Sequence, residues 1–533
     1  MNYILVCILS LFSFSCDKNA SDAPVVEEIP SFTLNASGTT VTLNWSSSNT
    51  ASLDLWRSIN NGEFEKIASG IKTTPYTDQI EKVQDNDLIT YRITGQGGYP
   101  HSYEAKRDQQ TVKLMLMTDD QLLDKVQSTT LKYFYDFAHP TCKLARERSN
   151  IPADLDVVTT GGTGFGIMAL IAGAERQYIT RQQAYEYIRT MTDFLTTADR
   201  FHGAYAHWYY GSTGKVKPFS PKDNGGDLVE TAFLMQGLLT AKAYFNTPSS
   251  SDAEKKLAAD IDQIWRGVEW NYYTQGQKKL FWHWSKEYGF EMNMGISGWN
   301  EGLIVYVLAA SSPTYPIDKE TYTNGYCNNG GIKNGRSYYG ITLPLGNDSE
   351  KGGPLFFTHY SFLGLDPRNL KDDFCDNYFE QNKNHVLINR AYCIENPKKH
   401  QGYSENFWGL TASDCPVVGY LAHAPGNNDN GTISPTAALS SIPYAPNECM
   451  QVLKYFYREL GSQLFGPYGF YDSINLGVSA EKQVYKSYLA IDQGPIVVMM
   501  ENYRSNLLWN TFMRNEEIIS GLRKLGFTSP HIK

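Results

Sequence analysis

Two hydrophobic patterns divide the chain. Between residues 31 and 113, apolar and polar residues alternate in short runs, most clearly at 39–45 and 88–94. Alternation with a period of two places one face of a β-strand against a core, and the Asn-Asn-Gly sequence at 60–62 is typical of a hairpin turn. Short strands at this spacing predict a small all-β sandwich domain over residues 31–113.

After Met117 the apolar residues recur at intervals of three and four, which is the spacing of amphipathic helices. Thr118, followed by two aspartates, is a typical helix start. Because no βαβ alternation is apparent, residues 118–533 predict a mainly α fold, an (α/α)6 toroid whose loops form a cleft at one end of the ring. We expect a hairpin within 201–219, a tight turn in the glycine-rich stretch 160–166, and helices near 164–175, 180–198, 227–245, 253–272, 298–310, 371–388, 436–442, 446–461, 488–500 and 504–524.

The first residues predict export. Residues 1–15 carry no charge and include an apolar run that is too short to span a bilayer, so we interpret them as a signal peptide. Cys16 follows Ser15 as in a bacterial lipobox, and residues 16–30 form a polar tether. We therefore expect a protein lipid-anchored through Cys16, in the periplasm or on the outer-membrane surface, with no other membrane contact. Ordinary secretion with an incidental cysteine is the alternative.

Composition narrows the possible functions. The net charge of −9 argues against a nucleic-acid partner, which would need a basic face. Aromatic residues make up 13% of the chain, which suits either a large core or a cleft that binds sugar rings. The six cysteines beyond Cys16 show no metal-binding spacing, so we expect no metal, no cofactor and structural or unpaired cysteines. We expect the chain to act as a monomer.

Carboxylates beside glycines and aromatic residues are the candidates for chemistry, because glycosidic cleavage commonly uses two carboxyl groups, one of them kept protonated. Asp223 and Asp227 lie in a glycine-containing turn before an apolar helix. Glu301 follows Trp299 and Asn300 at the start of another helix, and Asp492 interrupts an apolar run. Each has a structural alternative: helix capping for Asp227 and Asp492, a turn for Asp223, and a favourable first-turn charge for Glu301.

Aromatic and polar residues at loop–helix junctions are the candidates for binding substrate. An aromatic ring can stack on a sugar face while neighbouring polar groups bind hydroxyls, although each residue could equally belong to the core. The expected binding residues are Arg146, Glu230, Trp208, Trp299, Trp284, His359, Tyr360, Glu405, Asn406, Phe407 and Trp408.

These stretches together resemble a bacterial family often labelled putative glucoamylase, glycoside hydrolase family 144. The similarity extends over about residues 118–525. Residues 31–113 resemble a fibronectin type III or immunoglobulin-like module. The matching stretches are LARERS (144–149), TTGGTGFG (159–166), DNGGDLVETAFL (223–234), GWNEG (298–302), GGPLFFTHYSFLGLDPR (352–368), YSENFWGLTASD (403–414), GTISPTAALSSIPYAP (431–446) and AIDQGP (490–495).

The resemblance implies an (α/α)6 toroid that hydrolyses β-1,2-glucan with anomeric inversion, by endo action or by releasing sophorose from a chain end. Glu301 matches the position proposed as general acid in the family, and Asp223 and Asp227 match acids that are important for activity. Asp492 is our candidate for the general base.

Two other functions fit the residues less well. A non-catalytic glycan-binding lipoprotein could use the same aromatic loops, but all four candidate carboxylates are present. A polysaccharide lyase would usually need a basic cleft, and the net charge of −9 argues against one.

Overall fold

The computed structural model describes residues 31–46, 52–95, 109–346 and 350–532, so the expected signal peptide, tether and Cys16 lie outside the described residues. The chain forms two compact units, Met1–Thr118 and Asp119–Lys533. Among the described residues, no helix is both long and apolar enough to cross a membrane.

The first unit is a sandwich of two antiparallel sheets. One sheet has the order β1-β2-β5 and the other β4-β3-β6-β7. The inward residues of the alternating pattern, among them Leu43, Leu55 and Ile93, are fully buried between the sheets. The strands are β1 (Phe32–Ser37), β2 (Thr40–Trp45), β3 (Leu53–Ile59), β4 (Glu65–Ile71), β5 (Tyr76–Gln79), β6 (Leu88–Gly95) and β7 (Gln109–Lys113).

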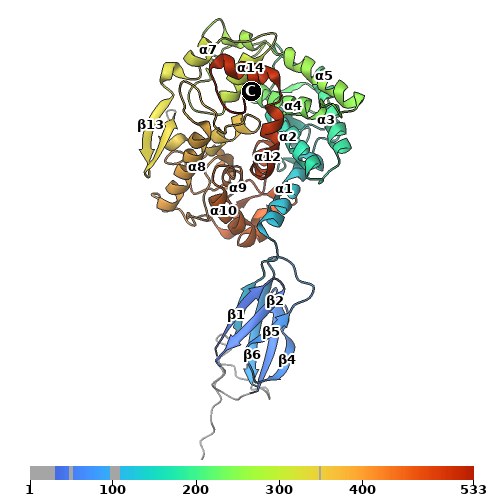
Figure 1. Ribbon diagram of the computed structural model, residues 1–533, viewed down its shortest axis with the longest axis vertical. Coiled ribbons are helices and arrows are strands. Elements are labelled where there is room, and N and C mark those ends of the chain that lie inside the picture. The colour runs from blue at the N-terminus through green and yellow to red at the C-terminus, as the bar shows by residue number, and fades with distance from the viewer. Residues whose placement is uncertain (1–30, 47–51, 96–108, 347–349, 533) are drawn as a thin grey trace, which may run out of the picture. The chain divides into compact units, whose positions relative to one another are not determined.

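The second unit is the expected toroid, and its inner ring consists of helices that are buried almost all round. Helix α2 packs against α4 and α12, α4 packs against α6, and α12 packs against α9. Figure 1 shows α2, α9 and α12 nearer the middle of the ring than α3, α5 and α10. The inner elements are α2 (Thr160–Glu175), α4 (Leu228–Phe245), α6 (Leu303–Ser311), η5 (Leu355–Thr358), η6 (Tyr360–Phe362), α9 (Pro435–Leu439) and α12 (Ala490–Ser505).

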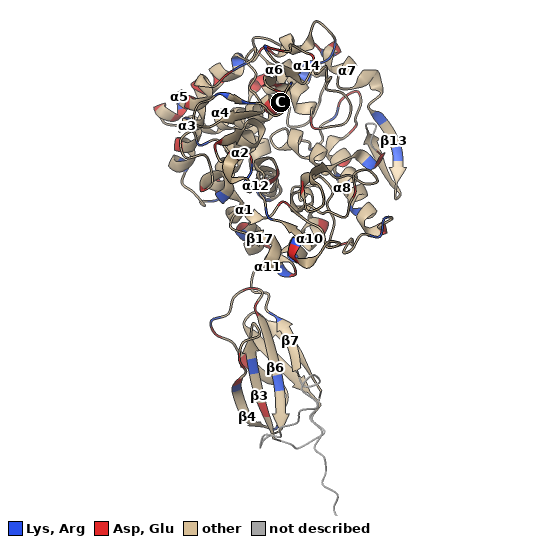
Figure 2. Ribbon diagram, turned by 180° about the vertical axis from the view of Figure 1, so that it is seen from behind, with Lys and Arg blue, Asp and Glu red and all other residues tan. Residues whose placement is uncertain are grey.

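The outer helices bury one face only, and their charged residues lie on the outside of the ring (Figure 2). In α5, for example, Leu257, Ile261 and Trp265 are buried at helical spacing while the acidic and basic residues between them are not. The outer helices are α1 (Asp119–Tyr135), α3 (Arg181–Thr197), α5 (Asp252–Arg266), α7 (Lys319–Asn324), α8 (Tyr378–Glu395), α10 (Pro446–Arg458) and α14 (Glu516–Leu525), with the short α11 (Gly461–Leu464) and α13 (Leu507–Phe512) between the last of them.

Small antiparallel ribbons connect the helices. Strands β8, β9 and β10 form one sheet, which contains the hairpin expected within 201–219, and the others are two-stranded. These strands are β8 (Val157–Thr159), β9 (Trp208–Tyr210), β10 (Val216–Lys217), β11 (Gly226–Asp227), β12 (His283–Trp284), β13 (Lys333–Tyr338), β14 (Ile341–Leu345), β15 (Ala412–Cys415), β16 (Gly419–Ala422), β17 (Phe465–Gly466), β18 (Gly469–Phe470), β19 (Ser473–Ile474) and β20 (Val484–Tyr485).

Some local predictions were wrong. The single helix expected near 504–524 is divided into α13 (Leu507–Phe512) and α14 (Glu516–Leu525). The helix expected at 371–388 begins only at Tyr378, where the Asn377 side chain caps it, and continues to Glu395. The glycine-rich stretch 160–166 is not a tight turn but the first two turns of α2.

The glycines of that stretch serve close packing. A Cβ atom on Gly164 would lie 2.1 Å from the Phe233 carbonyl oxygen, and one on Gly237 would lie 2.1 Å from the Gly164 carbonyl oxygen. The backbones of α2 and α4 therefore touch, which larger residues would prevent. Turn propensity alone misinterprets such glycines, because their role depends on a partner helix about 70 residues away.

The six cysteines after Cys16 are buried thiols, so the expectation that they are unpaired or structural agrees with the fold. They are Cys142, Cys327, Cys375, Cys393, Cys415 and Cys449.

Candidate active site

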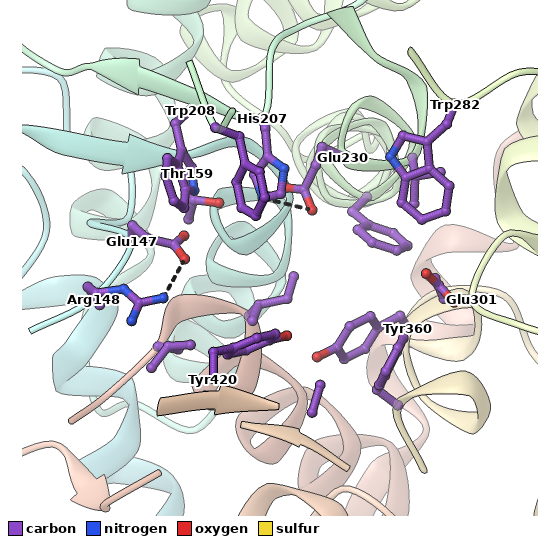
Figure 3. A pocket seen from close by; sticks show the side chains of 17 residues that line it. Glu147, Arg148, Thr159, His207, Trp208, Glu230, Trp282, Glu301, Tyr360 and Tyr420 are labelled. Carbon is purple, nitrogen blue, oxygen red and sulfur yellow. Dashed lines mark ion pairs between the residues drawn. The ribbon is translucent and has the colours of Figure 1, made fainter. Parts of the chain in front are cut away.

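One cavity of about 270 Å³ is lined by four of the candidate residues, Trp208, Glu230, Glu301 and Tyr360. Its walls come from the segments that precede the inner helices and from the ribbons beside them. Figure 3 shows His207 and Trp208 across the cavity from Tyr360 and Tyr420, and Glu301 across from Glu147. The lining residues are Glu147, Arg148, Thr159, His207, Trp208, Phe219, Val229, Glu230, Phe233, Trp282, Glu301, Phe356, Tyr360, Ala412, Tyr420, Leu489 and Ile491.

Asp227 combines a structural and a site role. Its Oδ1 accepts hydrogen bonds from the backbone N–H groups of Val229 and Glu230, both at 2.9 Å, so it caps α4. Its Oδ2 accepts a hydrogen bond from the Trp282 indole at 2.9 Å and lies 3.6 Å from Nδ1 of His207. Burial raises the pKa of Asp227 to about 7, and His207 opposes that rise.

Asp223 lies on the loop before this helix. Its Oδ1 is 3.5 Å from Nε2 of His283 but has no hydrogen-bond donor among the described residues. That nitrogen also faces the backbone N–H of Gly225, at 3.1 Å. A buried carboxylate oxygen without a donor is costly, and Asp223 is not among the residues that line the cavity.

Glu230 forms part of the cavity wall at the start of α4. Its Oε2 accepts a hydrogen bond from the Gly161 backbone N–H at 2.7 Å, and its Oε1 lies 3.9 Å from Nε2 of His207. Burial, together with repulsion from Glu147, Asp223 and Glu301, raises the pKa of Glu230 to about 8. Glu230 therefore holds a proton at neutral pH.

Glu301 is the acid on the opposite wall. It immediately precedes Gly302, which is the N-cap residue of α6, and its own backbone carbonyl accepts a hydrogen bond from the Ser361 hydroxyl at 2.6 Å. Burial raises the pKa of its carboxyl to about 7. A carboxyl group that keeps its proton near neutrality and borders a cavity can act as a general acid.

Asp492 lies behind the cavity wall, in the first turn of α12. It is 1% exposed, and its Oδ1 is 3.4 Å from the Tyr360 hydroxyl, which lines the cavity. Burial raises its pKa to about 7, while a hydrogen bond from Asp472 lowers it. Leu489 is the N-cap residue of this helix, so the capping alternative for Asp492 does not hold.

The sequence and fold of this chain are similar to those of known proteins. Residues 293–516 match the family described as "Putative glucoamylase". The endo-β-1,2-glucanase of Chitinophaga pinensis, solved as a sophorotriose and glucose complex, is 53% identical, with a TM-score of 0.75 over 78% of this chain and 100% of that protein. The chain belongs to glycoside hydrolase family 144.

Two relatives of the family 144 chain come from Parabacteroides distasonis. A β-1,2-glucanase structure is 40% identical, with a TM-score of 0.74 over 93% of this chain and 73% of that one. An exo β-1,2-glucooligosaccharide sophorohydrolase (non-reducing end) is 44% identical over 473 residues, which is 84% of this chain. The family 144 chain spans 63% of the length of that relative. The resemblance inferred from the sequence, and the fold it implied, are confirmed.

Several expected binding residues lie in the core instead of on the cavity wall. The rings of Trp299, Phe407 and Trp408 are fully buried, and a ring with no exposed face cannot stack on a sugar. His359 is buried and within hydrogen-bond distance of the Ser441 hydroxyl, and burial lowers its pKa to about 3, so it is neutral.

The remaining expected residues lie away from the cavity lining of the family 144 chain. Arg146 stacks on Phe137 and donates to backbone carbonyl oxygens. Trp284 packs in an aromatic cluster with His202. Glu405 and Asn406 occupy a turn and are not lining residues. Of the aromatic candidates, Trp208 and Tyr360 line the cavity.

Some lining residues were not among the expected site residues. Arg148 lies two positions after the expected Arg146 and forms ion pairs with Glu147 at 3.7 Å and Asp414 at 3.0 Å. Tyr420 comes from the β15–β16 hairpin, and nothing in its surrounding sequence signals a site. His207 precedes Trp208, so a search around that tryptophan would have found it.

The only group of possible metal ligands among the described residues is His207, Asp223 and Asp227, whose ligand atoms lie within 4.8 Å of one another. Because both oxygens of Asp227 already accept hydrogen bonds from protein donors, this cluster is better suited to binding hydroxyl groups than to enclosing an ion.

Proposed function

We propose that this family 144 chain hydrolyses β-1,2-linked glucan with inversion at the anomeric carbon. The observation that carries the proposal is Glu301, a cavity-wall carboxyl whose pKa is raised to about 7 by burial. The relatives named for β-1,2-glucan and sophorose hydrolysis support the linkage.

In this mechanism Glu301 is the general acid. Its proton passes to the glycosidic oxygen as the bond between that oxygen and the anomeric carbon breaks. The apolar surroundings that raise its pKa keep the proton on Glu301 until the departing oxygen, which develops negative charge as the bond breaks, takes that proton up.

Asp492 is the general base and acts through Tyr360. The attacking water gives a proton to the Tyr360 oxygen as the Tyr360 hydroxyl proton passes to Asp492, 3.4 Å away. The water oxygen then bonds to the anomeric carbon on the face opposite the departing group, which inverts its configuration. The buried Asp492 therefore need not touch the water.

The other carboxyls hold the sugar. We assign Asp223, Asp227 and Glu230 to hydroxyl binding, because they line or adjoin the cavity with His207 between two of them. Trp208, Trp282 and Phe356 supply aromatic surface for the sugar faces. These groups place the scissile bond between Glu301 and Tyr360.

The test is incubation of the signal-free protein with linear β-1,2-glucan, with products resolved by length over time. Sophorose from the start indicates exo action, and a ladder of oligosaccharides indicates endo action. The anomer first formed, followed by proton NMR, tests inversion. Binding without cleavage would favour a glycan-binding protein, and a product with new ultraviolet absorbance would favour a lyase; either result contradicts the proposal.

We also propose that the chain is exported, lipid-anchored through Cys16 and monomeric. The apolar run that ends at Ser15 and Cys16 supports export and the lipid anchor. Labelled fatty acid should be incorporated into the wild type in a bacterial host and not into C16S, and light scattering should give the mass of one chain. Unlabelled wild-type protein in the medium would instead indicate ordinary secretion.

A further inference from the structure

A buried carboxyl group next to Asp492 is left unused by the mechanism above. Asp472 follows β18, is 2% exposed and is not among the residues that line the cavity. Its Oδ2 accepts a hydrogen bond from the Asp414 backbone N–H at 2.6 Å. Its Oδ1 and the Oδ2 of Asp492 are both buried, and neither has an N–H or hydroxyl donor among the described residues.

The two carboxyls are close enough for each to shift the pKa of the other, and a hydrogen bond between them would satisfy an oxygen of each that has no other partner. Such a bond requires a proton, because two carboxylates present acceptors only. In a buried site two adjacent negative charges are also strongly unfavourable. The pair therefore shares one proton between Asp472 and Asp492.

The surroundings decide which residue holds that proton. Asp492 has the Tyr360 hydroxyl as a donor, which stabilises its charged form. Asp472 faces the carboxylates of Asp492 and Asp414, and these charges together with burial raise its pKa well above the usual range, against the effect of the single Asp414 N–H. The proton consequently resides on Asp472.

Other titratable groups face the pair from several elements. Glu147 adds negative charge near Asp492, and Tyr420 and Tyr133 lie near the pair as neutral phenols. The guanidinium of Arg148 is engaged by both oxygens of Asp414, at 3.0 and 3.2 Å. Because that cation is held by another acid, the proton on Asp472 remains the direct partner of Asp492.

We infer that Asp472 is a positioning residue for the proposed hydrolysis: as a neutral carboxylic acid it donates a hydrogen bond to Asp492, which keeps that base ionised and aimed at Tyr360. This inference rests on the proposed function. Asp472 touches no substrate, and its proton stays in place throughout turnover.

Two variants distinguish a role of Asp472 as a hydrogen-bond donor from a role in packing alone. D472N keeps a donor for Asp492 and an acceptor for the Asp414 N–H, whereas D472A removes both. In D472A we expect kcat to fall on the order of 10²-fold with little change in KM, and the acidic limb of the kcat profile to move to higher pH, because Asp492 loses its donor. D472N should recover activity to within about 10-fold of the wild type and restore the position of that limb.

Infrared spectroscopy can test whether Asp472 carries the proton, and it needs no substrate turnover. Because Glu230 also carries a proton at neutral pH, the Asp472 signal is obtained by difference: at pH ~7, the wild-type-minus-D472N spectrum should show one carboxylic-acid carbonyl band. The control is D366N: Asp366 is fully buried but is paired with the Arg368 guanidinium, so its loss should leave the band unchanged. Circular dichroism and binding of a β-1,2-glucooligosaccharide establish that each variant is folded.

Three results would overturn the inference. The acidic limb could stay in place in a folded D472A with wild-type kcat, which would make Asp472 structural only. A folded D472N could be as inactive as D472A, which would mean that Asp472 must ionise. The wild-type-minus-D472N difference spectrum could lack a carboxylic-acid carbonyl band. If the wild type fails to cleave glucan, the proposed function fails, while the infrared result still decides where the proton lies.

Discussion

At the residue scale, burial raises the pKa values of the acids in and beside the cavity. Glu301, Asp227 and Asp492 are ordinary carboxyls whose pKa values rise to about 7 because they are removed from water. The hydrogen-bond donors around them differ: Asp227 has two backbone N–H groups and an indole, whereas Asp492 has Tyr360 and Asp472. The residues therefore act differently although burial affects them alike.

E301Q should lower kcat on the order of 10³-fold, because the amide cannot supply the proton. In the wild type, kcat should fall as pH rises through about 7, where Glu301 loses its proton, and this alkaline limb should be absent from the residual activity of E301Q. Initial rates on β-1,2-glucan from pH ~5 to ~9 measure both. Wild-type turnover by a folded E301Q would remove Glu301 from the mechanism.

The two roles of Asp227 can be separated. D227N keeps an N-cap acceptor for α4 and should retain the wild-type melting temperature, whereas D227A should lose about 1 kcal/mol of stability. Both should lower kcat/KM on the order of 10²-fold, because the carboxylate that faces His207 and the sugar is gone. Thermal melts and initial rates test this, and equal stability of the two variants would contradict the capping role.

At the element scale, the starts of four inner helices or the segments just before them supply part of the site. Thr159 precedes α2, Glu230 begins α4, Glu301 precedes α6 and Ile491 begins α12. Helix N-termini carry partial positive charge and free N–H groups, one of which, at Gly161, binds Glu230. This arrangement partly compensates the cost of grouping so many acids.

The contact between α2 and α4 should tolerate no side chain at Gly164. G164A should lower the free energy of unfolding by about 3 kcal/mol, since its Cβ would overlap the Phe233 carbonyl oxygen. G461A is the matched control in α11, where the nearest atom would be 3.7 Å from the new Cβ, and should change stability by less than about 1 kcal/mol. Similar denaturant midpoints for both variants would contradict the close packing.

Patterns along the sequence predicted the helices and strands better than they predicted which residues line the cavity. Periodicity placed the outer helices, because burial repeats along one face of each, and continuous apolar runs placed the inner helices, which are buried almost all round. Neither pattern could separate Trp299, which faces the core, from Trp208, which faces the cavity, because both follow the same kind of loop. Asp472 was missed because its importance depends on Asp492, 20 residues away, and on contacts that only the folded ring creates.

At the scale of the whole molecule, the acids of the site couple stability to pH. Burial raises the pKa of Glu230 to about 8 and those of Asp227 and Glu301 to about 7. Folding therefore takes up protons between pH ~4, where these groups titrate in the unfolded chain, and pH ~8. The contribution is fully present below the unfolded pKa values and is lost as pH rises through the folded ones.

E230Q should consequently be more stable than the wild type at pH ~8, on the order of 2 kcal/mol, and the difference should shrink toward pH ~5. Denaturant unfolding at several pH values measures it. E405Q, which changes an exposed glutamate in a turn, is the control and should follow the wild type at every pH. A pH-independent difference for E230Q would contradict the raised pKa of Glu230.

The two units each have a core of their own, so a chain of residues 119–533 should fold alone. Since every residue that lines the cavity belongs to that unit, it should keep wild-type kcat within about 3-fold. Calorimetry of the full chain should show two transitions, one of which the shortened chain lacks. An insoluble or inactive 119–533 would contradict this independence.

The buried thiols can report how often each part of the toroid opens locally. They occur in or beside α1, α7, α8, α10 and the β15–β16 ribbon, while residues 31–118 contain no cysteine. A thiol-reactive dye can reach them only when the surrounding segment opens, so the labelling rate at each position reports the frequency of that opening. Mass spectrometry of the labelled peptides would map which sector of the ring opens first, with the β-sandwich silent in the same experiment.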